Sequence, residues 1–184
     1  MKIFGAWILA CSFFWGHPHV FVDASFDLTL HKTQADIHVF WRFDEMTSMM
    51  LLMDFDKNGD GKLDEEEVRF LQQEAFNHLA SLNYYTFIAH HTTTPLLITP
   101  KHFQAHTDGL HVTYSFRLTI PLDPNSSSLV VSCYDEDNLV AFFLEETVKA
   151  TTSRSNTALS HTFKREDRDF YSATLLYLHW KEHQ

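Results

Sequence analysis

The residues best suited to chemistry in this sequence lie between positions 56 and 67, where oxygen-bearing side chains recur mostly at alternate positions. The segment reads Asp-Lys-Asn-Gly-Asp-Gly-Lys-Leu-Asp-Glu-Glu-Glu and matches the calcium-loop pattern Asp-x-Asp/Asn-x-Asp/Asn-Gly-x5-Glu at each constrained position. Calcium is a hard cation that takes about six to eight oxygen ligands. The pattern therefore predicts a calcium site whose ligands are the side chains of Asp56, Asn58, Asp60, Asp64 and Glu67 and the backbone carbonyl of Lys62.

The sequence on both sides of this segment predicts two helices that hold it. Before the segment, methionines recur at helical spacing, and after it apolar residues mark one face of a second helix. Gly61 stands where such a loop has to turn sharply. We therefore predict an EF-hand, a helix–loop–helix calcium-binding unit, over residues 44–82. EF-hands usually work in pairs, but the sequence holds no second segment that matches the pattern.

The start of the chain predicts a signal peptide followed by a second candidate metal site. Lys2 precedes an uncharged apolar run, and Gly16 is a small residue at a cleavage point, so we expect residues 1–16 to be removed on export. Cleavage there would leave His17 with a free α-amine whose pKa is near ~8. The amine and the rings of His17 and His19 are suitable ligands for Zn²⁺ or Ni²⁺, although both histidines could simply begin a strand. The acids that would complete this site, if folding gathers them, are Asp23, Asp44, Glu45 and Asp135.

Composition restricts the function classes further. The formal net charge of −10 argues against binding to nucleic acid, DNA included, and against anionic membrane surfaces. The N-terminal apolar run is too short to span a bilayer, so we expect no membrane insertion of the mature chain. The sequence has no Gly-x-Ser-x-Gly motif and no glycine-rich phosphate loop, and Cys133 lies in an apolar run that favours an inert buried thiol. These features predict a non-catalytic protein.

The cysteine content favours one compartment. After removal of the signal peptide Cys133 would be the only cysteine, so no internal disulfide is expected. Export without a disulfide framework fits the bacterial periplasm better than a small secreted toxin or growth factor. A lipoprotein cut before Cys11 is the alternative, but the residues before it match the lipoprotein pattern weakly.

Alternating apolar residues predict that the mature chain, residues 17–184, is a single domain made mostly of strands. The predicted strands are 20–30, 35–43, 84–89, 96–99, 110–120, 129–134, 139–144 and 170–180. Residues 147–162 are rich in Thr and Ser without periodicity and are expected to form a loop. Since most of the strands alternate, with one face toward water, we predict an α+β fold: an antiparallel β-sandwich with the EF-hand inserted after the second strand.

The order of several short motifs resembles a bacterial periplasmic family of unknown function. The motifs are residues 17–23 (His-Pro-His-Val-Phe-Val-Asp), 41–45 (Trp-Arg-Phe-Asp-Glu) with Ser48, 56–67, 83–86 (Asn-Tyr-Tyr-Thr) and 134–135 (Tyr-Asp). The family has been labelled the periplasmic component of an uncharacterised transport system, and its members often accompany NicO-type permeases for nickel, cobalt or zinc. The family tends to continue Tyr-Asp with Pro and two aromatics, whereas this chain continues with Glu-Asp-Asn-Leu. The resemblance implies a metal-handling accessory whose partner is an inner-membrane metal permease.

Three functions are compatible with these features. The first is an exported calcium-binding accessory protein of a Zn, Ni or Co transport system, in which calcium stabilises the fold. The second is a calcium-responsive periplasmic regulator whose methionine-rich helix moves when calcium binds. The third is a copper enzyme that uses the amino-terminal His17 as a ligand.

Overall fold

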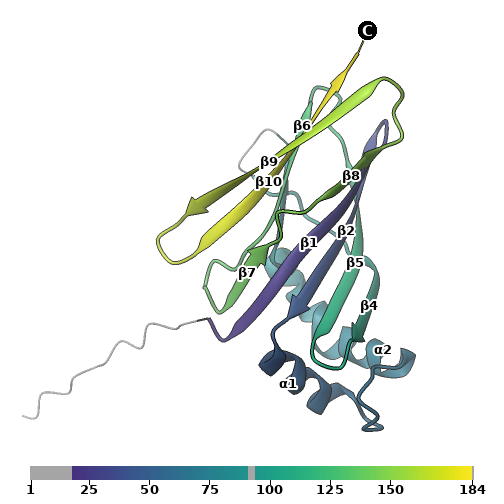
Figure 1. The fold of residues 1–184 in the computed structure, drawn as a ribbon, viewed down its shortest axis with the longest axis vertical. Helices are drawn as coiled ribbons and strands as arrows, with labels where there is room; N and C mark the ends of the chain where they lie inside the picture. The colour runs from purple at the N-terminus through teal and green to yellow at the C-terminus, as the bar shows by residue number, and fades with distance from the viewer. Residues whose placement is uncertain (1–17, 91–93, 184) are drawn as a thin grey trace, which may run out of the picture.

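Two β-sheets face each other and helices gather at one end of them (Figure 1). The computed structural model describes residues 18–90 and 94–183, so the predicted signal peptide and His17 lie outside the described residues. The described part is a mixed α+β structure made mostly of strands, in a sandwich-like arrangement. At that level the fold class predicted from the sequence is confirmed.

The larger sheet is built around a long hairpin. Its two strands are β1 (Val20–Leu30) and β2 (Gln34–Phe43), which pair antiparallel over nine residues of each strand. The strand order is β4-β5-β2-β1-β7, and β8 also pairs with β1. The remaining strands of this sheet are β4 (Lys101–Thr107), β5 (Val112–Pro121), β7 (Val140–Leu144) and β8 (Lys149–Thr152).

The smaller sheet has the order β3-β6-β10-β9. Its strands are β3 (Thr86–Ala89), β6 (Ser128–Cys133), β9 (Thr157–Asp167) and β10 (Ser172–Glu182). The longest pairing is between β9 and β10, which runs antiparallel from the pair Ser172 and Asp167 to the pair Glu182 and Thr157.

The core lies between the two sheets and follows from the alternation in the sequence. Every second residue of β1 and β2 is buried, because successive side chains of a strand point to opposite faces. Among the largest fully buried side chains are Phe26, Trp41, Phe116 and Leu176, which come from both sheets. The core therefore joins the two sheets.

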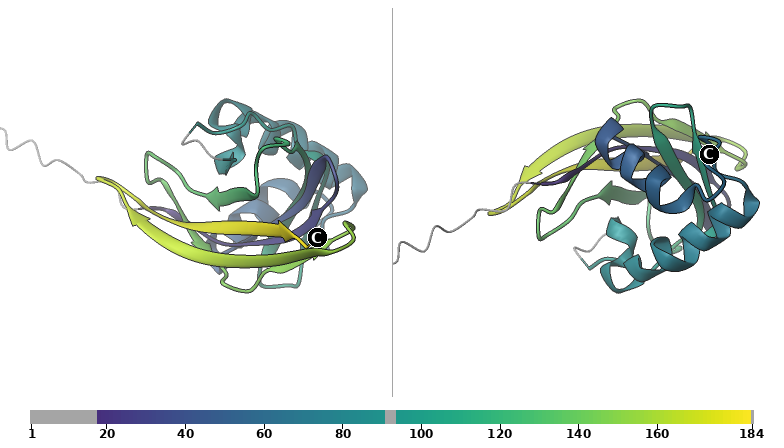
Figure 2. Two further views of the ribbon diagram at one scale, coloured as in Figure 1. Left: turned by 90° about the horizontal axis from the view of Figure 1, so that it is seen from above. Right: turned by 90° about the horizontal axis from the view of Figure 1, so that it is seen from below.

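The helices cover one end of this core (Figure 2). They are α1 (Glu45–Phe55), α2 (Glu65–Glu74) and the 3₁₀ segment η1 (Phe76–Tyr85). Phe76 packs at 4.2 Å between ring centroids on Phe103 of β4 and at 5.2 Å on Phe116 of β5. The predicted second helix is thus shorter than the apolar pattern indicates, since the α-helix ends at Glu74 and a tighter turn continues the segment.

The structure corrects four expectations about the strands. The loop predicted over 147–162 is wrong, because this stretch contains β8 and the first half of β9. No strand forms over 96–99, whereas β4 forms where none was predicted. The sandwich is also not purely antiparallel, since β1 pairs in parallel with β7 and then with β8.

Candidate metal centre

The predicted calcium segment connects α1 to α2, and both helix ends are capped by its residues. The backbone N–H of Asp56 donates to Leu52 O at 2.9 Å and so closes the last turn of α1. Asp64 caps the start of α2 by accepting hydrogen bonds from Glu66 N and Glu67 N. The intervening loop is therefore tied to a helix at each end, as the sequence predicts.

Two glycines allow the loop to turn. Gly59 has φ +72° and Gly61 has φ +76°, in the left-handed region that other residues rarely adopt. A Cβ atom at either position would contact nothing within 4 Å, so the glycines are required by backbone conformation and not by lack of space.

The side-chain oxygens of the loop point back toward its own backbone. Asp56 accepts hydrogen bonds from Gly59 N at 2.7 Å and, through its second oxygen, from Gly61 N at 2.8 Å. Asn58 Oδ1 accepts from Asp60 N at 2.9 Å. Asp60 Oδ1 accepts from Lys62 N at 2.9 Å. Each of the first three predicted ligands therefore has acceptor capacity left over, because an oxygen carries two lone pairs.

Glu67 closes the loop from the side of α2. Only 4% of this acidic residue is exposed. One carboxylate oxygen accepts from Lys57 N at 2.8 Å and from Asn58 N at 3.2 Å, and the other accepts from Asp64 N at 2.9 Å. The last predicted ligand therefore reaches across to the start of the loop while completing a capping box with Asp64.

The donor set fits a hard cation, because it consists of carboxylate, amide and carbonyl oxygens. In the described ranges, no three His, Cys, Asp or Glu side chains come close enough together to hold an ion. The loop oxygens accept hydrogen bonds from backbone N–H groups. Asp56, Asn58 and Asp60 each keep a free lone pair, whereas Oε1 of Glu67 accepts two hydrogen bonds and would have to give one up to bind an ion.

Only one of the two histidines of the predicted nitrogen site, His19, lies among the described residues. His17 lies outside the described residues, so its predicted role with His19 is untested. His19 is exposed and immediately precedes β1, and its backbone N–H donates to Leu139 O at 3.0 Å. The side chain of His19 thus stays open to solvent where the chain enters the sheet.

The fold gathers three of the four acids predicted to complete that site. Asp23, Asp44 and Glu45 line one hollow of about 550 Å³, together with Arg42 and His111. Asp135, in contrast, lines a different hollow.

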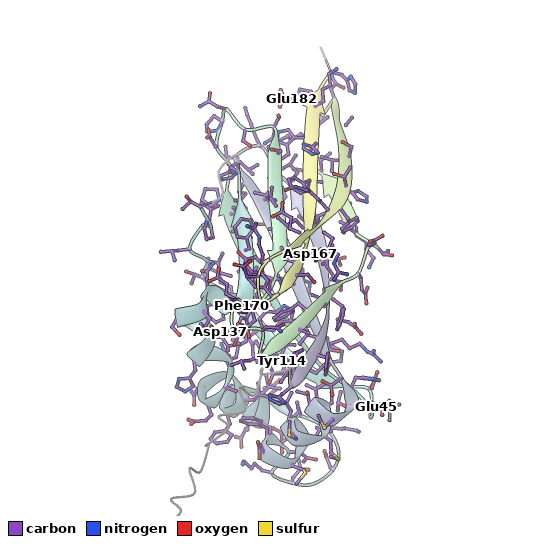
Figure 3. All side chains as sticks on the ribbon, turned by 90° about the vertical axis from the view of Figure 1, so that its left-hand side faces the viewer. Glu45, Tyr114, Asp137, Asp167, Phe170 and Glu182 are labelled. Atoms are coloured by element: carbon purple, nitrogen blue, oxygen red, sulfur yellow. The ribbon has the colours of Figure 1, made fainter. Side chains whose placement is uncertain are left out.

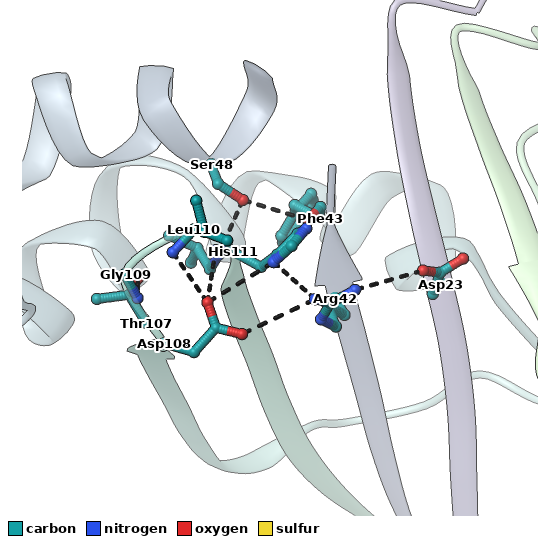
Figure 4. A network of polar contacts seen from close by, with 10 residues as sticks. Asp23, Arg42, Phe43, Ser48, Thr107, Asp108, Gly109, Leu110 and His111 are labelled. Atoms are coloured by element: carbon teal, nitrogen blue, oxygen red, sulfur yellow. Dashed lines mark hydrogen bonds and ion pairs between the residues drawn. The ribbon is translucent and has the colours of Figure 1, made fainter. Parts of the chain in front are cut away.

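Arg42 already supplies a positive charge to this acidic hollow (Figure 4). Its guanidinium lies 3.8 Å from a carboxylate oxygen of Asp23 and 3.8 Å from one of Asp108. The same group is 2.6 Å from Nδ1 of His111, and because a guanidinium only donates, Nδ1 must be the acceptor. The hollow is thus a mixed-charge network, which fits a bare cation poorly. Sequence reasoning missed this network because Asp108 and His111 are remote from Arg42 in the chain.

Asp44 fastens the start of α1 to β1. Its carboxylate accepts from Thr47 N at 2.9 Å, from Thr47 Oγ1 at 2.6 Å and from Phe21 N at 3.0 Å. Burial raises the pKa of Asp44, but these hydrogen bonds outweigh it and leave the pKa below the ordinary value of 3.8. Ser48, which is fully buried (Figure 4), links α1 to β5, because Val112 N donates to its Oγ at 2.8 Å.

Asp44 is expected to contribute stability that acid removes. A group whose pKa is lower in the folded state stabilises the fold above its unfolded value and loses that contribution as pH falls through the folded value. The stability difference between the wild type and Asp44→Asn should therefore be constant near neutral pH and shrink below the ordinary value of 3.8. Urea unfolding at pH 7 and pH 3 measures it, and an equal difference at both pH values would contradict the expectation.

The Asn-Tyr-Tyr-Thr motif forms an unusual turn at the end of η1. Asn83, Tyr84 and Tyr85 have φ values of 49°, 51° and 47°, three successive residues in the left-handed region. The Asn83 amide holds the turn by donating to Thr86 O and to Leu96 O, both at 3.0 Å. Its Oδ1 accepts from Ile98 N at 3.1 Å. The Asn83 side chain therefore supplies the hydrogen-bond partners of three backbone groups, those of Thr86, Leu96 and Ile98.

The Tyr-Asp motif lies against this turn. Tyr134 N donates to Tyr85 O at 3.0 Å, and residues of both motifs line one hollow of about 300 Å³. The carboxylate of Asp135 is 5% exposed and accepts from Asp137 N, Leu139 N and Val140 N. Asp135 thus shapes the next turn and lies apart from the hollow that Asp23, Asp44 and Glu45 line.

Two side chains near these motifs have raised pKa values because of burial. The pKa of Tyr85 is raised by burial first, and then by the charges of Asp135 and Asp137. Burial raises the pKa of the Cys133 thiol to about 12, although hydrogen bonds from Trp41 and Thr86 act in the opposite direction. Both groups therefore stay protonated at neutral pH. The thiol is 3% exposed and fits the inert role predicted for it.

A family model described as a protein of unknown function (DUF1007) matches residues 3–177. No curated protein matches the chain. Across the described residues, no helix has the length and apolar character needed to cross a bilayer.

Proposed function

We propose, for a chain that belongs to the family of proteins of unknown function DUF1007, that it is an exported calcium-binding accessory protein of a transition-metal transport system. Residues 56–67 form an EF-hand calcium loop in this proposal, with Asp56, Asn58, Asp60, Lys62, Asp64 and Glu67 as its ligands. Calcium stabilises the fold and is not a catalytic cofactor. The transported ion is Zn²⁺, Ni²⁺ or Co²⁺, and the partner is an inner-membrane permease.

One observation carries the calcium proposal: Glu67 crosses from α2 to the beginning of the loop. Its oxygen lies 2.8 Å from Lys57 N, directly after the first predicted ligand. In an EF-hand the twelfth residue binds the ion through both carboxylate oxygens. Glu67 is on the correct side of the loop to do so, at the cost of its hydrogen bond to Lys57 N or to Asn58 N.

Calcium is expected to raise the melting temperature of the protein. Extracellular calcium modules bind with Kd of about 10⁻⁴–10⁻³ M. At ~10 mM calcium such affinities stabilise a fold by roughly 1.4–2.7 kcal/mol, since only the folded loop binds. For a chain of this size that is a gain of roughly 3–10 °C. Thermal unfolding with calcium and with a chelator measures the gain.

The variant Glu67→Gln separates calcium binding from helix capping. Glutamine still completes a capping box, so α2 should keep its start, but it cannot offer two carboxylate oxygens to an ion. We expect some loss of stability without calcium, because a glutamine NH2 cannot accept the hydrogen bonds from Lys57 N and Asn58 N while its oxygen accepts from Asp64 N. Most of the calcium-dependent gain should be lost in addition. Glu66→Gln removes the same charge from an exposed neighbour and should retain the gain. A wild type that gains nothing in millimolar calcium would overturn the proposal.

The transition-metal part of the proposal depends on the mature amino terminus. If cleavage exposes His17, its amine and the two histidine rings form a nitrogen site for Zn²⁺ or Ni²⁺. Mass spectrometry of the exported protein identifies the terminus. Calorimetry with Zn²⁺, Ni²⁺ and Co²⁺ on the wild type, His17→Ala and His19→Ala then tests the ligands. A terminus other than His17, or equal affinity in all three proteins, argues against this site.

The permease partnership has its own test. Deleting the gene of the accessory protein in its native host should lower the cellular content of one of the three metals to the level found when the permease is deleted. Deleting both should cause no further loss, because the two would act in one route. Additive losses would contradict the partnership.

A calcium-responsive regulator is the second candidate, and the burial of α1 favours it. Helix α1 buries only Thr47, Ser48 and Phe55, so little packing would be lost if it moved. Hydrogen exchange distinguishes the two functions. A regulator requires faster amide exchange in α1 when calcium binds. A stabilising site requires slower exchange in the loop and in both helices.

A further inference from the structure

The methionines of α1 form an exposed group that the proposed calcium function does not use. The chain has five methionines, and all except Met1 lie on this helix. Residues three and four apart on a helix are neighbours, so the spacing of these four places them along one side. We call them the methionine face: Met46, Met49, Met50 and Met53.

The methionine face is open to solvent to an unusual degree. The exposed fractions are 56% for Met46, 56% for Met49, 46% for Met50 and 77% for Met53. Burying apolar side chains is favourable, yet α1 turns toward the sandwich with two small hydroxyl residues and Phe55. Yellow sulfur atoms are correspondingly seen at the helical end of the molecule (Figure 3). Such a concentration of exposed apolar side chains indicates an interaction site.

The chemistry of the methionine side chain indicates which kind of partner this face would bind. Methionine differs from leucine in carrying a polarizable thioether sulfur. Thioethers are soft ligands that select Cu(I) over the harder divalent ions, and Ag(I) is a soft monovalent ion of the same kind. A face that needed only apolar contact could have used leucine, which α1 also contains at Leu51 and Leu52.

The geometry and charge of the helix suit a cation. The side chains of Met46, Met49 and Met53 line one open hollow of about 720 Å³, beside the carboxylate residue Asp56. Neighbouring positions have Cβ atoms about 5–6 Å apart, and three rotatable bonds let each sulfur swing toward a shared ion. The helix itself carries Glu45 and Asp54 and no Lys, Arg or His.

We propose that the methionine face binds a soft monovalent cation, Cu(I) or Ag(I), through its thioether sulfurs. This site goes beyond the proposed calcium function, because its ligands are thioether sulfurs and not the oxygens of the calcium loop. It is also distinct from the histidine site, which offers nitrogen ligands at the start of the chain. Since a thioether takes up no proton in water, binding through sulfur should persist at acid pH, where a free imidazole is mostly protonated and binds metal ions weakly.

Calorimetric titration with silver nitrate at pH 5, in chloride-free buffer, tests the proposal. The matched variant replaces all four methionines with leucine, a swap that conserves volume and apolar character. We expect one tightly bound Ag⁺ per wild-type chain and at least roughly 100-fold weaker binding by the variant, because the soft ligands are gone. Residual binding by the Cys133 thiol would be common to both proteins. Equal affinities would overturn the proposal and leave the face as an apolar contact surface.

Three further experiments keep the proposal testable if the fourfold variant does not fold or if calcium does not bind. If the fourfold variant does not fold, the double variant Met49→Leu/Met53→Leu replaces it, and a loss of Ag⁺ affinity is still expected. In the wild type, Ag⁺ should shift the methyl resonances of the methionines on α1, and unchanged resonances at saturation would overturn the proposal. The variant Glu67→Gln should bind Ag⁺ like the wild type even if its calcium response is lost. The calcium and silver results can therefore fail independently.

Discussion

Replacing Trp41 with alanine is expected to destabilise the fold by about 3–5 kcal/mol, the usual cost of deleting a buried tryptophan. Its side chain is 1% exposed, and its ring centroid lies 5.1 Å from that of Phe116 and 5.4 Å from that of Phe142. The indole N–H donates to the Sγ atom of Cys133 at 3.4 Å, from one sheet to the other. The truncation would thus open a cavity between the sheets.

Urea unfolding of the wild type, Trp41→Ala and Trp41→Phe measures this effect. The phenylalanine variant keeps a ring in the core and loses mainly the N–H donor, so its cost should be clearly smaller. Natural domains have total stabilities of roughly 5–15 kcal/mol, so the alanine variant would be marginal. A cost below ~1 kcal/mol would show that the core at this end is loosely packed and would contradict the arrangement described.

Replacing Asn83 with alanine is expected to destabilise the fold by roughly 3 kcal/mol. The reason is that each buried polar group left unpaired costs about 1–3 kcal/mol. The Asn83 amide satisfies Ile98 N, Thr86 O and Leu96 O. Alanine would leave these three groups without that partner. It would also be held in the left-handed conformation, which costs a residue with a Cβ atom about 1–2 kcal/mol.

Asn156→Ala is the matched control for this variant. Asn156 also has a left-handed backbone, with φ 55°, but it lies on the exposed turn before β9. Its replacement should show the backbone cost alone. Equal losses in the two variants would mean that the Asn83 side chain contributes nothing beyond its conformation. Urea unfolding of both variants under one set of conditions decides between the outcomes.

The sequence predicted β1, β2 and β5 and missed β9, for a physical reason. β1, β2 and β5 bury every second side chain, so their hydrophobic alternation is strong and reveals both their existence and their inner face. β9 is an edge strand whose residues are mostly exposed. It is held by backbone hydrogen bonds to β10, which leave no mark in the side-chain pattern.

The candidate metal centre was predictable to a similar degree. The residues of the loop are consecutive in the chain, so their pattern predicted the turn at Gly61 and the helices on each side. The capping role of Glu67 is local as well and follows from Asp64 three residues earlier. The network of Arg42 with His111 depends on the pairing of β2 with β5. No local sequence pattern predicts that pairing.

The parallel pairing of β1 has a consequence for how the protein folds. β1 begins at Val20, but the strands that complete its outer edge, β7 and β8, begin at Val140 and Lys149. About 120 residues must therefore be synthesised, and a long loop closed, before the first strand has both of its neighbours. Domains dominated by such distant pairings have high contact order and fold in milliseconds to seconds instead of microseconds. Until that closure, the free edge of β1 is the surface at which two unfinished copies could pair with each other.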